Sequence, residues 1–221
     1  MPNPPRIVVL GRQGAGKGTQ CARLAAYLGV PHLSTGDLFR TAVRDGTPVG
    51  VQVAGYLERG ELVPDELVVG IVQEHAAAEG LDDRGYLLDG FPRTIAQAEL
   101  FLGSDGKGVD VAVELDVPVD VVVERIARRR VCPVDGWTTI VDDPSVAAVP
   151  CPDGHDAVQR EDDTPEAVRR RLALYERETG PLGPWFAQRG LLERVDGVGD
   201  PDEVFDRILG ALRARGLLSA A

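Results

Sequence analysis

The glycine-rich segment GRQGAGKGTQ, residues 11–20, constrains the fold of this chain more than any other feature. It follows the apolar run RIVVL (6–10), which predicts a buried strand, and it opens a predicted helix that Gly29 ends. The segment matches the G-x-x-x-x-G-K pattern, in which backbone N–H groups and a helix N-terminus surround a phosphate. The strand–loop–helix context favours this phosphate loop over a merely structural turn. Lys17 is then predicted to reach the β- and γ-phosphates of a nucleotide.

The residue after Lys17 is a glycine, Gly18, and not the serine or threonine that usually binds Mg²⁺ in such loops. Thr19 is the nearest hydroxyl. This departure argues against a switch GTPase, which holds its metal at that position.

Predicted strands alternate with predicted helices along the rest of the chain, which indicates a parallel sheet covered on both faces. The further strands are expected at residues 85–89, 109–117 and 191–197. One helix is expected after Pro118, with Val119, Val122, Val123 and Ile126 on its apolar face. Two segments, 34–63 and 131–160, do not fit the alternation and are predicted to be insertions at loop ends of the sheet. Ligands of open α/β sheets bind at those ends.

The 221 residues suffice for one large domain with insertions, and the formal net charge of −11 disfavours generic binding to nucleic acid or to an anionic membrane. No apolar run is long enough to span a bilayer, and the N-terminus does not resemble a signal peptide. We therefore expect a cytoplasmic protein with reduced thiols. Arginines nevertheless cluster at 125–130 and 169–171, as solvated helix faces or as local anion sites.

Candidate residues for a second substrate lie in STGDLFR (34–40) and DGFPR (89–93). Ser34 or Thr35 can cap the helix that follows. Asp89, at the carboxyl end of a predicted strand, is placed like a carboxylate that holds Mg²⁺ through water. Together with the phosphate loop, these segments predict a lysine, a carboxylate and several arginines around one crevice.

Six motifs occur in the order and spacing seen in adenylate kinases: GAGKGTQ, STGDLFR, LVPDE, DGFPRT, RIARRRV and REDD. From about residue 6 to residue 210 the chain resembles this family, in its bacterial form with a long lid. The resemblance implies an α/β, P-loop NTPase-like fold: a five-stranded parallel sheet with helices on both faces and two insertions. It implies a core of residues 1–33, 64–126 and 164–221, an AMP-binding insertion of residues 34–63, and a lid of residues 127–163.

The resemblance also implies the activity, which is reversible phosphoryl transfer from MgATP to AMP giving two ADP. The implied ATP-binding residues are Gly14, Ala15, Gly16, Lys17, Gly18, Thr19, Arg125 and Arg129. The implied AMP-binding residues are Thr35, Arg40, Glu61, Leu62, Val63, Gly90, Phe91, Pro92, Arg93, Gln97, Arg160 and Arg171. The implied catalytic residues are Lys17, Arg93, Arg129, Arg160 and Arg171. Family members are commonly monomeric. Gln13 stands where the family usually has proline.

Three other functions remain as alternatives. A UMP or CMP kinase resembles this chain but typically has alanine in place of Thr35, asparagine in place of Thr94, and a short lid. A non-catalytic nucleotide-binding module would not need the full set of Lys17, Asp89 and arginines. A nucleic-acid-binding ATPase is disfavoured by the net charge of −11.

The segments CPVDG (132–136) and CPDGH (151–155) lie in the implied lid and raise the question of a structural zinc site. Cys132, Asp135 and Cys151 supply three zinc ligands, and either His155 or Asp153 supplies the fourth. The alternative is a polar hairpin with two reduced thiols. Cys21, His32 and His75 receive no functional role, because no second ligand lies near them in the sequence.

Overall fold

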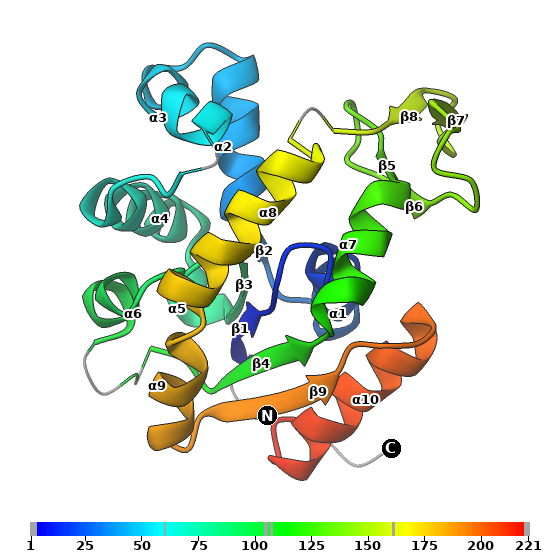
Figure 1. The fold of residues 1–221 in the computed structure, drawn as a ribbon. Coiled ribbons are helices and arrows are strands. Elements are labelled where there is room, and N and C mark those ends of the chain that lie inside the picture. Colours follow the sequence, from blue (N-terminus) through cyan, green and yellow to red (C-terminus); the bar gives the residue numbers. More distant parts are fainter. Residues whose placement is uncertain (1–3, 60, 104–105, 107, 161, 219–221) are drawn as a thin grey trace.

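The computed structural model describes residues 4–59, 61–103, 106, 108–160 and 162–218 (Figure 1). Its centre is a parallel five-stranded sheet in the order β2-β3-β1-β4-β9. The strands are β1 (Arg6–Leu10), β2 (His32–Ser34), β3 (Tyr86–Asp89), β4 (Val111–Asp116) and β9 (Leu192–Asp196). The residue pattern predicted four of these strands. It did not indicate β2, because a strand of three residues that begins with a histidine contains no recognisable apolar run.

The central strand β1 contributes side chains to both layers of the core, as expected for a strand that is buried on both faces. Ile7 and Val9 pack with α1, α7, α8 and α10, whereas Val8 and Leu10 pack with the helices α2 to α6 and α9. The helices outside the first insertion are α1 (Lys17–Leu28), α4 (Asp65–Glu79), α5 (Leu81–Arg84), α6 (Ile95–Leu102), α7 (Val119–Arg128), α8 (Pro165–Leu174), α9 (Leu182–Gln188) and α10 (Pro201–Ala214), with the π-helical turn η1 (Tyr175–Thr179) after α8. The predicted α/β fold class is thereby confirmed.

The two segments that broke the alternation form elements of their own, although Ser34 ends β2 and Phe39 and Val53 pack into the core layer beside the sheet. Two helices, α2 (Thr35–Arg44) and α3 (Pro48–Arg59), form the first insertion beside β2. The second is a small antiparallel sheet in the order β6-β5-β8-β7, which lies beyond the end of α7 (Figure 1). Its strands are β5 (Arg129–Val131), β6 (Thr138–Ile140), β7 (Ala148–Pro150) and β8 (Asp156–Val158).

The apolar face predicted for α7 is narrower than expected. Val122 and Ile126 are buried, but Val119 and Val123 are 46% and 43% exposed. Position on a helical wheel predicts only which side chains share a face, and neighbouring elements decide how much of that face they cover. In the described part of the chain, no helix combines the length and the apolar character needed to cross a bilayer.

Candidate functional site

The phosphate loop has the backbone geometry that anion binding requires. Gly14 and Gly16 have positive φ values of 83° and 93°, and a side chain at Gly14 would collide with Ile126 of α7. Gly16 precedes α1 and offers no side-chain cap, so the first N–H groups of this helix remain available to a ligand. Lys17 Nζ donates to the carbonyls of Gly11 and Arg12 at 2.7 and 3.0 Å. The lysine therefore lies on the loop that a phosphate would occupy.

Asp89 ends β3 next to this loop, and its side chain is largely buried. A Cβ atom on Gly18 would lie 3.8 Å from Asp89 Oδ2, so the glycine leaves the carboxylate open toward the first turn of α1. Burial lowers the pKa of Lys17, and Arg93 and Arg171 lower it further, while Asp89 opposes both effects. This arrangement of a lysine and a carboxylate around a loop suits a metal-bound polyphosphate.

Five predicted arginines converge on the same region although they come from different parts of the fold. Burial lowers the pKa of Arg93 to about 10, and the cations of Arg171 and Arg40 contribute to this decrease, against the effect of Asp89. Burial also lowers the pKa of Arg171, and Arg160 and Arg129 lower it further, against the opposing effect of Asp162. Such crowding of cations is unfavourable without anions, and a bound polyphosphate would relieve it.

Two adjacent aspartates, Asp162 and Asp163, hold three of these arginines. Asp162 accepts two hydrogen bonds from Arg160, at 2.8 and 2.7 Å, and one from Arg171 at 2.6 Å. Asp163, whose side chain is 0% exposed, accepts a bidentate pair from Arg129. Neither aspartate was among the predicted site residues, although both belong to the REDD motif. Their adjacency to Arg160 was the available signal.

Gln13 connects the phosphate loop to this group of residues. Its Nε2 donates to Asp163 Oδ1 at 3.1 Å, while its Oε1 is buried without a hydrogen-bond partner. A proline at this position could not make the contact. The departure from the usual family residue therefore creates a direct link between the loop and the carboxylate that holds Arg129.

The residues predicted to bind AMP form a second connected group. The Gly90 carbonyl accepts from Thr35 Oγ1 at 2.9 Å and from Arg93 Nε at 2.7 Å. Gln97 accepts from the backbone N–H of Arg93 at 2.7 Å and donates to Asp65 Oδ1 at 2.8 Å. These contacts fix the segment after β3 against α4 and α6.

Several other residues predicted to bind AMP have side chains whose burial limits their contact with a ligand. Phe91 is 1% exposed and stacks edge to face on Phe101, so it is a core side chain, and only its backbone can face a ligand. Val63 is also buried. The neighbouring residues of these two segments, Glu61, Leu62 and Pro92, are exposed, half-buried and buried, respectively. Arg40 lies across the site on α2 and pairs with Asp37 at 2.5 Å.

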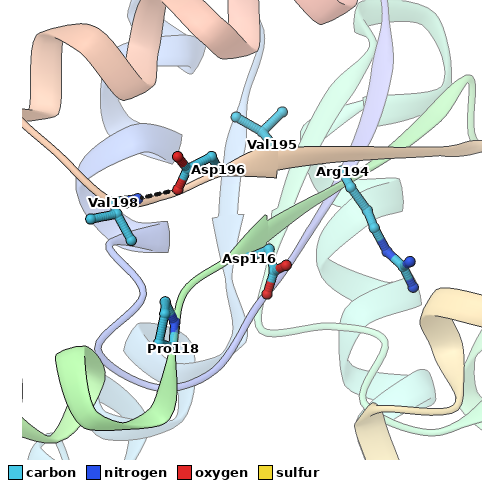
Figure 2. A pocket seen from close by; sticks show the side chains of 6 residues that line it. All are labelled: Asp116, Pro118, Arg194, Val195, Asp196 and Val198. Carbon is cyan, nitrogen blue, oxygen red and sulfur yellow. Dashed lines mark hydrogen bonds between the residues drawn. The ribbon is translucent and has the colours of Figure 1, made fainter.

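Arg125 lies between the phosphate loop and the segment that follows β9. Both of its terminal nitrogens donate to the Gly197 carbonyl at 3.1 Å, and Nη1 lies 3.5 Å from the carbonyl of Ala15. A pocket of about 340 Å³ opens nearby at the carboxyl ends of β4 and β9 (Figure 2). It is lined by Asp116, Pro118, Arg194, Val195, Asp196 and Val198. None of these residues belongs to the predicted phosphate-binding set, so the site assignment does not depend on this pocket.

Comparison with known proteins identifies the family. Residues 9–191 match the family described as "Adenylate kinase". The sequence is 46% identical over 197 residues to the adenylate kinase of Moorella thermoacetica, covering 87% of this chain and 90% of that protein. It is 40% identical over 215 residues to the adenylate kinase of Bacillus subtilis, covering 94% and 99%.

The chain belongs to the adenylate kinase family. The resemblance inferred from the six motifs is therefore confirmed, including its bacterial type. Adenylate kinases use Mg²⁺ with ATP, and Asp89 fits this metal because its largely buried carboxylate stands open beside the phosphate loop.

The two cysteine segments of the chain meet in the small antiparallel sheet. Ligand atoms of Cys132, Asp135, Cys151 and His155 all lie within 4.8 Å of one another, and Asp153 is not part of this cluster. Asp135 Oδ2 accepts from Cys151 Sγ at 3.5 Å, and Cys151 Sγ lies 3.9 Å from His155 Nδ1. All three cysteines of the chain are free. The donor set fits zinc, and the same contacts serve equally well as a polar network without metal.

The core of this small sheet is too limited to hold it together by apolar burial alone. It consists of Cys132, Cys151 and Ala157, with Trp137 and Val149 packed against them. A second support is Arg130, which is 1% exposed and donates to the carbonyls of Ala127, Arg129, Pro144 and Val146.

Proposed function

We propose that this chain catalyses the reversible transfer of a phosphoryl group from MgATP to AMP, giving two molecules of ADP. The observation that carries the proposal is the convergence of Lys17, Asp89 and five arginines around the carboxyl ends of β1 and β3. Two polyanions can meet there because the cations are already assembled. ATP, AMP and ADP are the substrates on which adenylate kinases act.

The two nucleotides would occupy opposite sides of this cluster. ATP phosphates bind the loop of residues 14–19, with Arg125 and Arg129 beside them. AMP binds the group around Thr35, Gly90 and Arg93, with residues 61–63 and Gln97 facing its base. Residues 34–63 form the AMP-binding unit, residues 127–163 form the lid, and the remaining residues form the core.

Positioning and charge neutralisation account for catalysis in this proposal. The attacking oxygen belongs to the AMP phosphate, which is already ionised, so no general base is required. The arginines stay charged and bind phosphate in a bidentate manner. Bound Mg²⁺ would neutralise charge on the phosphates of ATP, and Asp89 would hold it through water. Closure of the two insertions would exclude the water that otherwise hydrolyses ATP.

Four substitutions test this assignment. Lys17→Ala is expected to abolish turnover without unfolding the protein, and a near-normal rate would refute the site. Arg93→Ala should impair use of AMP more than binding of ATP, and Arg129→Ala should do the reverse. Arg169→Ala is the matched control, because its side chain is 71% exposed on α8. Equal losses for both nucleotides in both site variants would contradict the assignment of sides.

We further propose that the lid binds one structural zinc through Cys132, Asp135, Cys151 and His155. Such a site would stabilise a sheet whose own core is small, because the metal cannot bind the unfolded chain as well. Metal analysis after extensive dialysis should find about one zinc per chain. The zinc should be lost in His155→Ala and retained in Asp153→Ala. The absence of zinc from protein prepared with zinc available would favour the polar hairpin.

The oligomeric state and the location of the enzyme are also part of the proposal. The enzyme is proposed to act as a monomer in the cytoplasm, without nucleic-acid or membrane partners. Sedimentation measurements at micromolar concentration would test the monomeric state, and a stable dimer would contradict it.

A further inference from the structure

A second group of metal-ligating side chains lies next to the phosphate loop, away from the lid. Ligand atoms of Cys21, His32 and Asp89 all lie within 4.8 Å of one another. Cys21 is 0% exposed, and the side chains of His32 and Asp89 are 23% and 12% exposed. His32 Nε2 lies 3.8 Å from Asp89 Oδ2.

The fold brings these three residues together from separate parts of the chain. Cys21 lies one turn after Lys17 on α1, and it belongs to the core layer that α1 forms with the sheet. In the parallel pairing of β2 with β3, His32 lies opposite Leu87, and Ser34 lies opposite Asp89. His32 and Asp89 therefore lie on the same face of adjacent strands, two register positions apart, and this is the face that α1 covers.

We propose that Cys21, His32 and Asp89 form a binding site for a thiophilic divalent cation such as Zn²⁺, and that its occupation inhibits the proposed kinase reaction. A thiolate, an imidazole and a carboxylate together suit Zn²⁺ or Co²⁺, whereas Mg²⁺ prefers oxygen ligands. Three protein ligands leave one coordination position open, on the partly exposed side of His32 and Asp89.

The site already holds one negative charge, that of Asp89. On coordination the thiol proton of Cys21 would leave to solvent, and the divalent ion would compensate both negative charges. The Lys17 ammonium is bound by the carbonyls of Gly11 and Arg12, so its hydrogen bonds do not occupy the ligand atoms of this site.

The inhibitory effect rests on the proposed function, because it depends on the role of Asp89. A cation held by Asp89 Oδ would remove the carboxylate from hydrated Mg²⁺ and would place positive charge where MgATP binds. Inhibition by Zn²⁺ should therefore raise the apparent KM for MgATP. It should leave the apparent KM for AMP unchanged.

The binding test uses Co²⁺, whose thiolate complexes absorb in the near ultraviolet. The sequence contains three cysteines, so a Cys132→Ser, Cys151→Ser protein retains Cys21 as its only thiol. Titrating this protein with Co²⁺ should produce thiolate charge-transfer absorption at one equivalent. Adding Cys21→Ser should abolish it, and His32→Gln should weaken binding by more than about tenfold, since even outer-shell changes cost that much. His75→Gln, on α4, is the matched control and should leave the titration unchanged.

Two further measurements keep the proposal refutable. If the double serine protein does not fold, equilibrium dialysis of the unmodified chain and of Cys21→Ser against excess Zn²⁺ should differ by one bound ion. Turnover of Cys21→Ser should resist Zn²⁺ concentrations that inhibit the unmodified chain, with equal rates for the two proteins in buffer that contains Mg²⁺ but no Zn²⁺. Absence of the charge-transfer band, or equal bands with and without Cys21, would overturn the site. Binding without inhibition would overturn the inhibitory role. Loss of the kinase assignment alone would leave the Co²⁺ titration intact.

Discussion

Replacing Arg93 by methionine should stabilise the free protein while it destroys the use of AMP. Burial and neighbouring cations lower the pKa of Arg93 from 12.5 to about 10. At about 1.36 kcal/mol per pKa unit, the charged side chain costs the folded state about 3 kcal/mol. The sign follows from the direction of the shift: below pH 10 both folded and unfolded chains carry the proton, so the full cost is present at pH 7.

The net gain is smaller than this cost. Arg93 keeps partial contact with solvent, and we therefore reduce the penalty to about 2–3 kcal/mol. Methionine also loses the hydrogen bond from Arg93 Nε to the Gly90 carbonyl, worth about 1 kcal/mol. The expected net stabilisation is about 1–2 kcal/mol. For a chain of this size it corresponds to a rise in Tm of about 2–8 °C.

Thermal unfolding without nucleotide measures this effect, and Arg93→Lys is the matched control. Lysine keeps the positive charge, so it should not raise Tm, although it also impairs AMP use because it lacks the bidentate fork. In Arg93→Met, kcat/KM for AMP should fall by at least about 10²-fold, comparable to the loss of one transition-state donor. A lower Tm for Arg93→Met, or an equal rise for Arg93→Lys, would refute the argument that cation crowding limits the stability of the free enzyme.

Three other predictions concern the contacts around the lid and the acceptor. Asp162→Asn should release Arg160 and Arg171 and lower kcat, and a Tm measured in parallel separates this effect from unfolding. Burial alone would raise the pKa of Asp162, but the two arginines lower it below 3.8. The stabilising contribution of Asp162 should therefore be lost only as the pH falls through and below that value in acid unfolding. Gln13→Leu should change the unfolding free energy by less than about 1 kcal/mol, because it removes both a hydrogen bond to Asp163 and an unpaired buried oxygen. Gln13→Glu should destabilise the protein, because it places a second carboxylate beside Asp163. Equal Tm values for the two variants would contradict this difference. CMP and UMP should be much poorer acceptors than AMP in a coupled assay, since a site that bonds one base leaves groups unpaired with another, and comparable kcat/KM values would favour the alternative of a UMP or CMP kinase.

Much of this protein was predictable from local sequence patterns. The phosphate loop could be identified because its glycines, its lysine and the preceding apolar strand are consecutive in the chain, and their backbone geometry depends little on distant residues. The order of motifs indicated the family and hence the fold. The four longer parallel strands were also predictable, since each carries an apolar run, whereas β2 was not.

Tertiary structure decided which separated side chains meet. Asp162 and Asp163 hold three of the predicted arginines, and Gln13 reaches Asp163 across 150 positions of the chain. His155, and not Asp153, joins Cys132, Asp135 and Cys151, because the hairpin geometry brings its ring to Cys151. Phe91 turned out to be a core side chain, and Cys21 and His32 lie beside Asp89 although nothing near them in the sequence suggested a partner. The physical reason is that periodicity and spacing determine local backbone conformation and the face on which a residue lies, whereas the packing of helices on the sheet determines which faces come into contact.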